Sequence, residues 1–199
     1  MGLNRLEVIT PIMPTIQGTY TLFIAADIEE NSLLRALQNQ TKQLLKHPEP
    51  IPHITLVHLG LFRITEHNPH DLYQATISSL ERTCDLFIAD FKMQTLAQVK
   101  LEAQLELFSN ALVLRLKPGA AYDALQELAH LLQIQTAASK ESKPFVPHIT
   151  LGRVKKDVTP ESLIEYQKYI KPVIINIPSC SLYQSGPSGE HRLLARYKL

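Results

Sequence analysis

A five-residue sequence that occurs twice constrains this chain more than any other feature. Pro-His-Ile-Thr-Leu at Pro52–Leu56 recurs unchanged at Pro147–Leu151, so the two copies start 95 residues apart in a chain of 199. At average residue usage, a coincidence of this kind has roughly a 1–2% chance in a chain of this length. The repeat therefore indicates an internal duplication, in which each half of the chain contributes one copy.

The segments around the two copies support a duplication because they follow the same order of predicted elements. In the first half, hydrophobic spacing and capping residues predict a strand at Tyr20–Ala26, a helix at Asn31–Lys46, the strand of the first copy, a helix from Asn68-Pro69 to about Thr83, and a strand at Leu86–Met93. In the second half they predict a strand at Ala111–Leu116, a helix at Ala120–Gln133, the strand of the second copy, a helix from Thr159-Pro160 to about Ile170, strands at Pro172–Ile177 and Ser179–Gln184, and an edge strand at His191–Lys198. We expect residues 1–18 to be an N-terminal extension and 19–199 to form a single bilobal domain.

Composition excludes several other classes of protein. Hydrophobic residues make up 45% of the chain, and 20 basic against 19 acidic side chains leave a net charge of +1. These values are typical of a globular protein and argue against one that holds nucleic acid by bulk electrostatics. No apolar run is long enough for a signal peptide or a membrane span, so we expect a cytoplasmic protein without a membrane partner. Cys84 and Cys180 are predicted to be core thiols, because two isolated cysteines make neither a disulfide framework nor a zinc site.

The repeated motif places two polar side chains on one face of a strand. Residues two apart on a strand point the same way, so His53 and Thr55 share one face and His148 and Thr150 share another. The isoleucine and leucine of each copy point to the opposite face, where a core can anchor them. Packing of the halves about a pseudo-twofold axis would bring the polar faces together across a groove.

Two imidazoles and two hydroxyls suit hydrolysis or transesterification of a phosphodiester without a metal. A neutral imidazole can take a proton from water or a sugar hydroxyl, and a protonated one can give a proton to the leaving oxygen. Both forms exist near neutral pH because the pKa of imidazole is about 6.5. The hydroxyls can donate to phosphoryl oxygens as charge builds on them. A single His-x-Thr is more often a buried polar pair, but two copies in matching contexts favour the catalytic interpretation.

On these residues the chain resembles the two-histidine (2H) phosphoesterase superfamily, whose signature is two His-x-Thr/Ser motifs flanked by apolar residues. Within it, the chain most resembles bacterial and archaeal RNA 2′,3′-cyclic phosphodiesterases, also called 2′-5′ RNA ligase-like proteins. The resemblance covers roughly residues 20–198. Its matching segments are Leu22–Ala25, His53–Leu56 with Leu59-Gly60, Phe145–Arg153 and Ser181–Ser185.

The resemblance implies both a fold and a reaction. The fold is α+β, a bilobal pseudo-twofold duplication with two antiparallel sheets around a central cleft and helices outside. The reaction is metal-independent conversion of a 2′,3′-cyclic phosphate end to a 2′-phosphate, with weak reversible 2′-5′ RNA ligation as the same chemistry run with a sugar hydroxyl. In that scheme His53 is the general acid, His148 is the general base, and Thr55 and Thr150 hold the phosphate. No cofactor and no metal is implied, and we expect a monomer that binds RNA or an oligonucleotide with a 2′,3′-cyclic phosphate end, or a small cyclic nucleotide.

Three further residues are candidates for substrate binding. Arg153 matches a position that is usually basic in the resembled family, and its guanidinium could neutralise phosphate charge. Phe145 and Tyr183 are candidates for stacking on a nucleobase. After the first motif the family commonly carries an arginine, where this chain has Val57 followed by His58. The loss of that cation leaves room for a substrate smaller than RNA.

The remaining histidines are predicted to be structural or exposed. His58 lies five residues from His53, so on a regular strand it faces the opposite side. The i, i+3 pair His67 and His70 is predicted to lie in a loop rather than to hold a metal, since no carboxylate or cysteine cluster accompanies it. Isolated surface positions are predicted for His47, His130 and His191.

Two other functions remain open at this point. One is a 2H enzyme that cleaves 2′-5′ oligoadenylate, a cyclic dinucleotide or ADP-ribose cyclic phosphate. The other, of a different class, is a non-catalytic nucleotide-binding module on the same fold. The presence of both histidines and both threonines argues against the module, because binding alone needs no paired acid and base.

Overall fold

The structure, a computed structural model, describes residues 6–8, 18–64, 70–90, 99–101, 103–136, 145–168, 170–171, 173–186 and 190–198. The strands are β1 (Leu6–Val8), β2 (Gly18–Asp27), β3 (Leu45–Pro48), β4 (His53–Ile64), β5 (Val99–Leu101), β6 (Ala103–Phe108), β7 (Ala111–Leu116), β8 (His148–Val154), β9 (Val173–Ile175), β10 (Ser179–Ser185) and β11 (His191–Lys198). The helices are α1 (Ser32–Gln40), α2 (His70–Asp90), α4 (Ala120–Gln135), the 3₁₀ helix η1 (Pro160–Leu163) and α5 (Ile164–Gln167).

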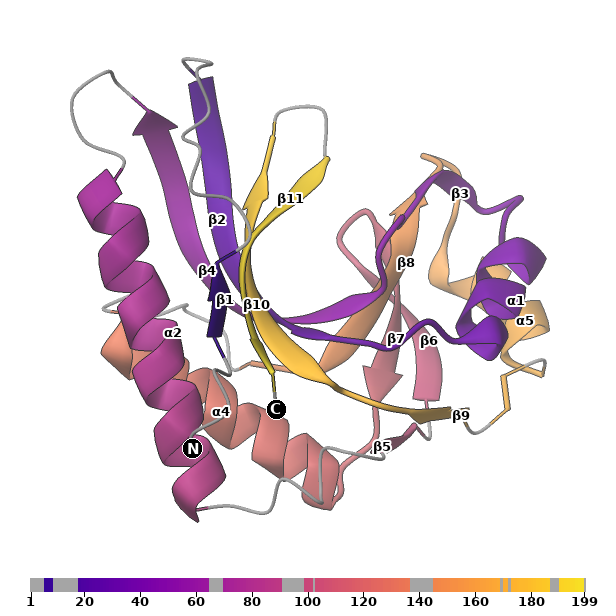
Figure 1. Ribbon diagram of the computed structural model, residues 1–199. Coiled ribbons are helices and arrows are strands. Elements are labelled where there is room, and N and C mark those ends of the chain that lie inside the picture. The colour runs from indigo at the N-terminus through magenta and orange to yellow at the C-terminus, as the bar shows by residue number, and fades with distance from the viewer. Residues whose placement is uncertain are drawn as a thin grey trace.

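Two antiparallel sheets form the centre of the molecule (Figure 1). Sheet A has the strand order β1-β11-β10-β2-β4, and sheet B has the order β3-β8-β7-β6, while β5 pairs with β9 alone. Helices α2 and α4 contact each other on one flank, where α2 also contacts β10 and β11. On the other flank α1 and α5 lie beside sheet B. This arrangement confirms the predicted α+β fold class.

One apolar core joins the two sheets. The isoleucine and leucine of both motif copies are at most 4% exposed, as the alternation of faces predicts. They pack with alternate residues of β2 and β7 and with apolar positions of α2 and α4, including Leu22, Ile24, Leu80, Leu112, Leu114, Leu125 and Leu128. Burial of these side chains from both halves holds the motif strands in fixed positions.

The predicted duplication is visible in the order and pairing of the elements. In each half a first strand, a helix and the motif strand follow in order, β2-α1-β4 and β7-α4-β8, with the short strand β3 inserted between α1 and β4. In each half the motif strand pairs antiparallel with the first strand. The pairing of β4 with β2 skips Leu56, and the pairing of β8 with β7 skips Leu151. Each leucine is therefore the extra residue of a β-bulge that directly follows the motif threonine.

The helix predicted at Asn31–Lys46 is shorter in the structure. It begins at Ser32, where the Asn31 side chain accepts from the first backbone N–H groups, and it ends at Gln40. Residues 45–48 then form β3 at the edge of sheet B. The leucine spacing alone favours a longer helix, but residues 45–48 pair antiparallel with β8 instead, with Leu45 opposite Val154. Just beyond this pairing, the Lys155 N–H donates to the carbonyl of Leu44 at 3.0 Å.

The strand predicted at Leu86–Met93 is wrong over the part that the structure describes, because α2 continues through Asp90. The buried positions Ile77, Leu80 and Cys84 have the three- and four-residue spacing of a helix face. A short apolar run that follows such a face does not distinguish a strand from further helix. The predicted start of this helix, Asn68-Pro69, lies outside the described residues.

Sheet A is wider than predicted. The strand His191–Lys198 is predicted at an edge, but β1 pairs with it on its outer side, with Leu6 opposite Tyr197. The predicted extension, residues 1–18, thus contributes a strand to sheet A. The strands β3, β5 and β6 are also absent from the prediction.

A substitution at Gly152 tests how closely β3 approaches β8. Gly152 has a φ of +156°, and a Cβ added there would lie 2.5 Å from the carbonyl oxygen of His47. We expect Gly152→Ala to lower the free energy of unfolding by about 3 kcal/mol, because backbone atoms must move apart. The measurement is urea unfolding. Gly60→Ala is the matched control, since Gly60 has a φ of +97° but open space around it, and should cost about 1 kcal/mol. Equal losses would contradict this account.

Candidate active site

The two motif histidines are held in the same way. His53 Nδ1 lies 2.8 Å from the carbonyl oxygen of Ile51, and His148 Nδ1 lies 2.7 Å from that of Val146. A carbonyl oxygen only accepts, so each Nδ1 carries the hydrogen and donates it. In the neutral ring, Nε2 then holds the lone pair. The duplication therefore gives both imidazoles the same tautomer and leaves the same nitrogen of each for chemistry.

The strand register shows which side chains accompany His53 on its side of sheet A, which we call the motif face of that sheet. Cross-strand partners point the same way, and His53 lies opposite Asp27, which lies opposite Ser179. Thr55 lies two residues further on and is half-buried. Phe23 completes the centre of this face, with its ring stacked on that of His53 at a centroid distance of 5.3 Å.

His58 lies on this face as well, contrary to the prediction that it faces the opposite side. It is opposite Phe23 in the register, and the two rings lie 6.2 Å apart. The bulge at Leu56 shifts the alternation by one residue, so a side chain five positions after His53 returns to the same face. The corresponding bulge in β8 places Arg153 on the same side as His148, because the two motifs have identical spacing.

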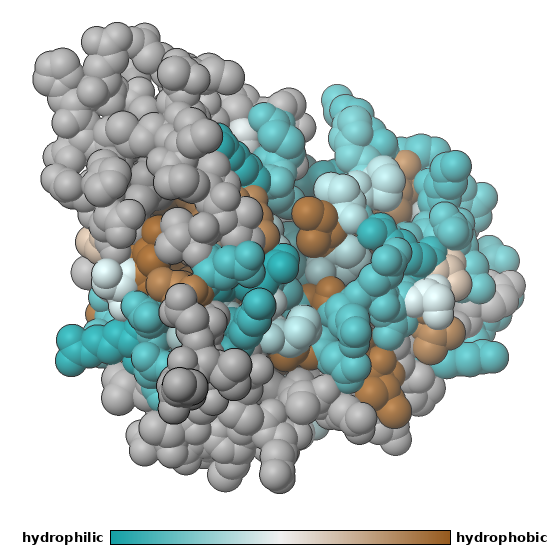
Figure 2. Space-filling model, viewed as in Figure 1, coloured by the Kyte–Doolittle hydropathy of each residue, from teal (hydrophilic) through white to brown (hydrophobic). Residues whose placement is uncertain are grey.

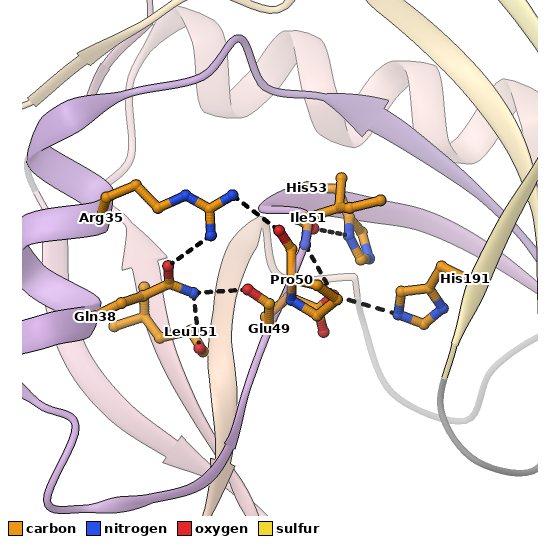
Figure 3. Close-up of polar contacts among 8 residues, drawn as sticks. All are labelled: Arg35, Gln38, Glu49, Pro50, Ile51, His53, Leu151 and His191. Atoms are coloured by element: carbon orange, nitrogen blue, oxygen red, sulfur yellow. Dashed lines mark hydrogen bonds and ion pairs between the residues drawn. The ribbon is translucent and has the colours of Figure 1, made fainter.

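His191 is not an isolated surface residue, contrary to the prediction. Its ring meets that of His53 edge to face, with centroids 5.5 Å apart, and its Nε2 lies 3.4 Å from Glu49 Oε1. Both side chains of this ion pair are 14% exposed. Figure 3 shows the pair beside His53, with Glu49 on the loop that precedes β4 and His191 at the start of β11.

Asp27 is a buried carboxylate that organises the same face. Ser179, Ser181 and Tyr183 all donate hydroxyl hydrogen bonds to it, the last at 2.7 Å. Arg196 Nε lies 3.6 Å from Oδ2 of the carboxylate. Three hydroxyl donors and one cation therefore pair the oxygens of Asp27, although only 8% of the residue is exposed.

The side of sheet B that carries His148 forms the second motif face. His148 lies opposite Arg115, whose guanidinium is 3.3 Å from Glu106. The Phe108 ring contacts the His148 ring at a centroid distance of 4.7 Å. Arg153 extends toward solvent and donates to the Asn110 side chain at 2.6 Å.

The two motif strands approach each other between the sheets. Strands β4 and β8 contact each other, and the charge of His58 on sheet A acts on His148 of sheet B. Figure 2 shows the surface hollowed between β11 and β3, with hydrophilic residues on the β3 side. His148 of the second motif thus lies within electrostatic reach of His58 on the motif face of sheet A.

Burial sets the protonation of both motif histidines, but their neighbours differ. Burial lowers the pKa of His53, opposed in part by the hydrogen bond to Ile51 and by the carboxylates of Glu49 and Asp27, while His191 lowers it further. Burial also lowers the pKa of His148, opposed only by its bond to Val146 and reinforced by His58. Negative neighbours therefore favour the charged form of His53, and a positive neighbour disfavours that of His148.

The two aromatic candidates for base stacking lie mostly within the fold. Tyr183 is 3% exposed, with its ring stacked on Phe23 and its hydroxyl on Asp27. Burial and the nearby carboxylate raise the pKa of Tyr183 well above its usual value. Phe145 is half-buried against the core. Stacking by these rings stays a prediction, and the geometry favours a structural role for Tyr183.

The other sequence candidates lie away from this region or carry no ligand geometry. His130 is exposed on α4 and His47 is exposed on β3, as predicted for surface positions. Cys84 and Cys180 are both fully buried free thiols. Within the described ranges, no group of three His, Cys, Asp or Glu side chains could hold a metal ion, and no helix is long and apolar enough to cross a membrane.

Sequence reasoning missed Asp27, Glu49 and His191. Asp27 directly follows the first predicted strand, Tyr20–Ala26, and its position opposite His53 is known only from the strand register. Glu49 and His191 lie 142 residues apart in the chain and meet only because β11 packs beside the centre of sheet A. Neither has a motif of its own.

Solved structures share this fold over nearly the whole chain. E. coli LigT complexed with 3′-AMP has 20% sequence identity and a TM-score of 0.56, covering 92% of this chain and 99% of that one. A structure described as a phosphoesterase has 21% identity and a TM-score of 0.55, with the same coverage. The PDE domain of MHV ns2 has 13% identity and a TM-score of 0.55, covering 82% of this chain and 99% of that one. No protein-family model matches the sequence, and a comparison with curated proteins finds no match.

These likenesses define the class of structure. The chain has the LigT-like fold, in agreement with the resemblance to the 2H phosphoesterase superfamily that its two motifs carry. E. coli LigT structures with NADP⁺ and with ATP share the fold at TM-scores of 0.52 and 0.51.

The Asp27 network makes a prediction about stability. We expect Asp27→Asn to lower the free energy of unfolding by about 2 kcal/mol, because the amide keeps the shape but loses the charge that Arg196 and three hydroxyls stabilise. The measurement is urea unfolding at constant pH. Asp157→Asn, in an exposed turn, is the control and should change stability by less than about 0.5 kcal/mol. Equal effects of the two variants would refute the assigned role of Asp27.

Proposed function

We propose that this chain is a metal-independent phosphodiesterase that opens 2′,3′-cyclic phosphate ends of RNA or nucleotides to 2′-phosphates, with weak 2′-5′ RNA ligation as the reverse-type reaction. The observation that carries the proposal is the identical setting of His53 and His148. Each lies on a core-anchored motif strand, two residues before a threonine, with Nδ1 donating to the carbonyl two residues earlier.

This setting allows one imidazole to act as the acid and the other as the base, each through its Nε2 atom. A neutral imidazole with hydrogen on Nδ1 accepts a proton at Nε2, and its protonated form donates from Nε2. A pair in opposite protonation states can therefore move one proton from the attacking water and deliver another to the leaving oxygen. A module that only binds nucleotides has no use for such a pair.

The neighbouring charges support His53 as the acid and His148 as the base. Glu49 and Asp27 favour the imidazolium form of His53, whereas His58 opposes a positive charge on His148. In the proposed reaction, His148 Nε2 takes a proton from water as its oxygen bonds to phosphorus. The bond from phosphorus to the 3′ oxygen breaks, and His53 Nε2 protonates that oxygen, which leaves a 2′-phosphate.

Four side chains are proposed to hold the phosphate and the RNA chain attached to it. Thr55 and Thr150 donate to the non-bridging oxygens, where negative charge builds. Arg153 and His58 occupy equivalent positions after the two bulges, so each motif face carries one basic side chain beyond its threonine. The arginine that the resembled family commonly carries after the first motif falls at Val57 in this chain, and His58 is the next residue along β4.

The choice of substrate within this chemistry is part of the proposal. E. coli LigT binds 3′-AMP, and the shared fold together with a net charge of only +1 favours a nucleotide or a short RNA end over an extended duplex. The alternative substrates, 2′-5′ oligoadenylate, cyclic dinucleotides and ADP-ribose cyclic phosphate, are tested by comparing their rates with that of RNA ends.

The paired histidines predict a specific response to substitution. We expect His53→Ala and His148→Ala each to lower kcat by about 10²- to 10⁴-fold, with the double variant little worse than either alone, because the two act as one unit. The measurement is release of product from a short RNA with a 2′,3′-cyclic phosphate end, with EDTA present throughout.

The matched control for these variants is His130→Ala, an exposed histidine on α4, which should keep full activity. Thermal melting of all four proteins checks the fold. A single motif variant that stays active while folded would rule out the paired acid and base, and inhibition by EDTA that added metal reverses would rule out the metal-independent reaction.

The pH dependence follows from the direction of the pKa shifts. Activity falls at low pH as the base gains a proton and at high pH as the acid loses one, so the profile of kcat/KM is bell-shaped. Both histidines have a pKa below the ordinary 6.5, chiefly through burial, so we expect the optimum of kcat/KM on the acid side of pH 6.5. Bound phosphate favours both imidazolium forms, so the kcat optimum lies higher. An optimum of kcat/KM above pH 7.5 would contradict this assignment.

A further inference from the structure

The loop between β3 and β4 is held by hydrogen bonds to α1 and to β8. The Glu49 N–H donates to the carbonyl of Leu151, the bulge residue of the second motif, at 2.9 Å. The buried side chain of Gln38 donates to the carbonyls of both Glu49 and Leu151, at 2.9 and 3.0 Å. Arg35 donates to Gln38 and to the carbonyl of Pro50. Figure 3 shows these bonds running from α1 to the loop.

This bracing fixes the position of one carboxylate. With its backbone bound to α1 and to the second motif strand, Glu49 presents its side chain to His191 on β11. The hydrogen bond from His191, and the nearby charges of His53 and His191, lower the pKa of Glu49 although burial alone raises it. Glu49 is therefore ionised over the range in which the histidines titrate.

The ion pair adjoins the motif histidine of the first half only. His191 touches the rings of both His53 and Phe23, with centroids 5.5 and 5.1 Å away. His191 Nδ1 is buried and has no hydrogen-bond partner among the described residues, so Glu49 is the polar contact that orients this ring. In the second half, the residue equivalent to Glu49 by the repeat spacing is Pro144, which cannot supply a charge.

We propose that Glu49 and His191 are a positioning pair for His53, which makes this imidazole the proton donor of the pseudo-symmetric site. The inference rests on the proposed function for its meaning in catalysis, but not for its effect on His53. The Glu49 carboxylate compensates one positive charge on the adjacent imidazoles of His53 and His191. When His53 holds that charge it can donate a proton, and a positive charge on His191 opposes it.

The other titratable groups around His53 are held by partners of their own or lie next to it on the same face. On β2, Asp27 is bound by three hydroxyls and faces Arg196 of β11. Tyr183 on β10 is uncharged, because its pKa is raised. His58 on β4 and His148 on β8 are further titratable groups near the site. Of all these, Glu49 and His191 alone form a pair in which both members act on His53 with opposite signs.

Because Glu49 and His191 act on the pKa of His53 with opposite signs, substitutions of the two residues should have different effects. In Glu49→Gln the shape is kept and the negative charge is lost, so the pKa of His53 should fall. In His191→Gln a positive charge is lost while an amide can still reach Glu49, so the pKa of His53 should rise or stay the same. The measurement is NMR titration of the His53 ring in the full chain, followed by the pH profile of kcat.

The two variants should also separate in kinetics. A fall of about one unit makes the protonated fraction of His53 about tenfold smaller above its pKa, so Glu49→Gln should lower kcat about tenfold on the alkaline side and change KM little. His191→Gln should not show that loss. Glu165→Gln, an exposed residue paired with Lys168, is the control and should leave His53 and the kinetics unchanged.

Each outcome decides the question. A fall in the His53 pKa for Glu49→Gln but not for His191→Gln supports the positioning pair. Equal shifts in both variants, or none in Glu49→Gln while its melting temperature stays near that of the wild type, would overturn it. If Glu49→Gln melts early, Glu49→Asp keeps the charge and should keep the His53 pKa near the wild-type value. The titration needs no turnover, so an inactive wild-type protein would refute the proposed function and leave this inference standing.

Discussion

The bulge that follows each motif threonine decides which side chains reach the space between the sheets. On a regular strand, the residue five positions after the motif histidine would point into the core side of the sheet. Because Leu56 and Leu151 are each an extra residue, His58 and Arg153 return to the motif faces instead. Burial of the two leucines on the opposite face fixes both bulges, so the same apolar packing that stabilises the fold sets the polar content of the site.

The duplication gives the site its symmetry, and individual substitutions then break it. Both motif histidines have the same backbone partner and the same tautomer. The position opposite the histidine, however, is Asp27 in the first half and Arg115 in the second. Glu49 adds a second negative charge on the side of His53 only. A pair of identical imidazoles would share one proton equally, whereas we propose that this arrangement assigns the proton to His53.

The sequence predicts the duplicated fold and the motif residues because both depend on local pattern. An exact repeat, apolar alternation and helix caps are local signals, and β7 and β11 have the predicted bounds. The site partners Asp27, Glu49 and His191 depend instead on strand order and register, which bring distant segments together. A bulge is a register shift with no residue signature, and for that reason the predicted side for His58 is wrong. The edge strand β3 and the long α2 are missed because tertiary contacts decide between helix and strand at ambiguous leucine-rich segments.

The central claim is that this pair of histidines opens a cyclic phosphate toward a 2′-phosphate without a metal. The most direct measurement is incubation of the purified chain, in EDTA, with a short RNA that ends in a 2′,3′-cyclic phosphate, with 2′- and 3′-phosphate products resolved by ³¹P NMR. We predict accumulation of the 2′-phosphate alone. A 3′-phosphate product, or no product from a folded protein with either RNA or 2′,3′-cyclic AMP, would contradict the account.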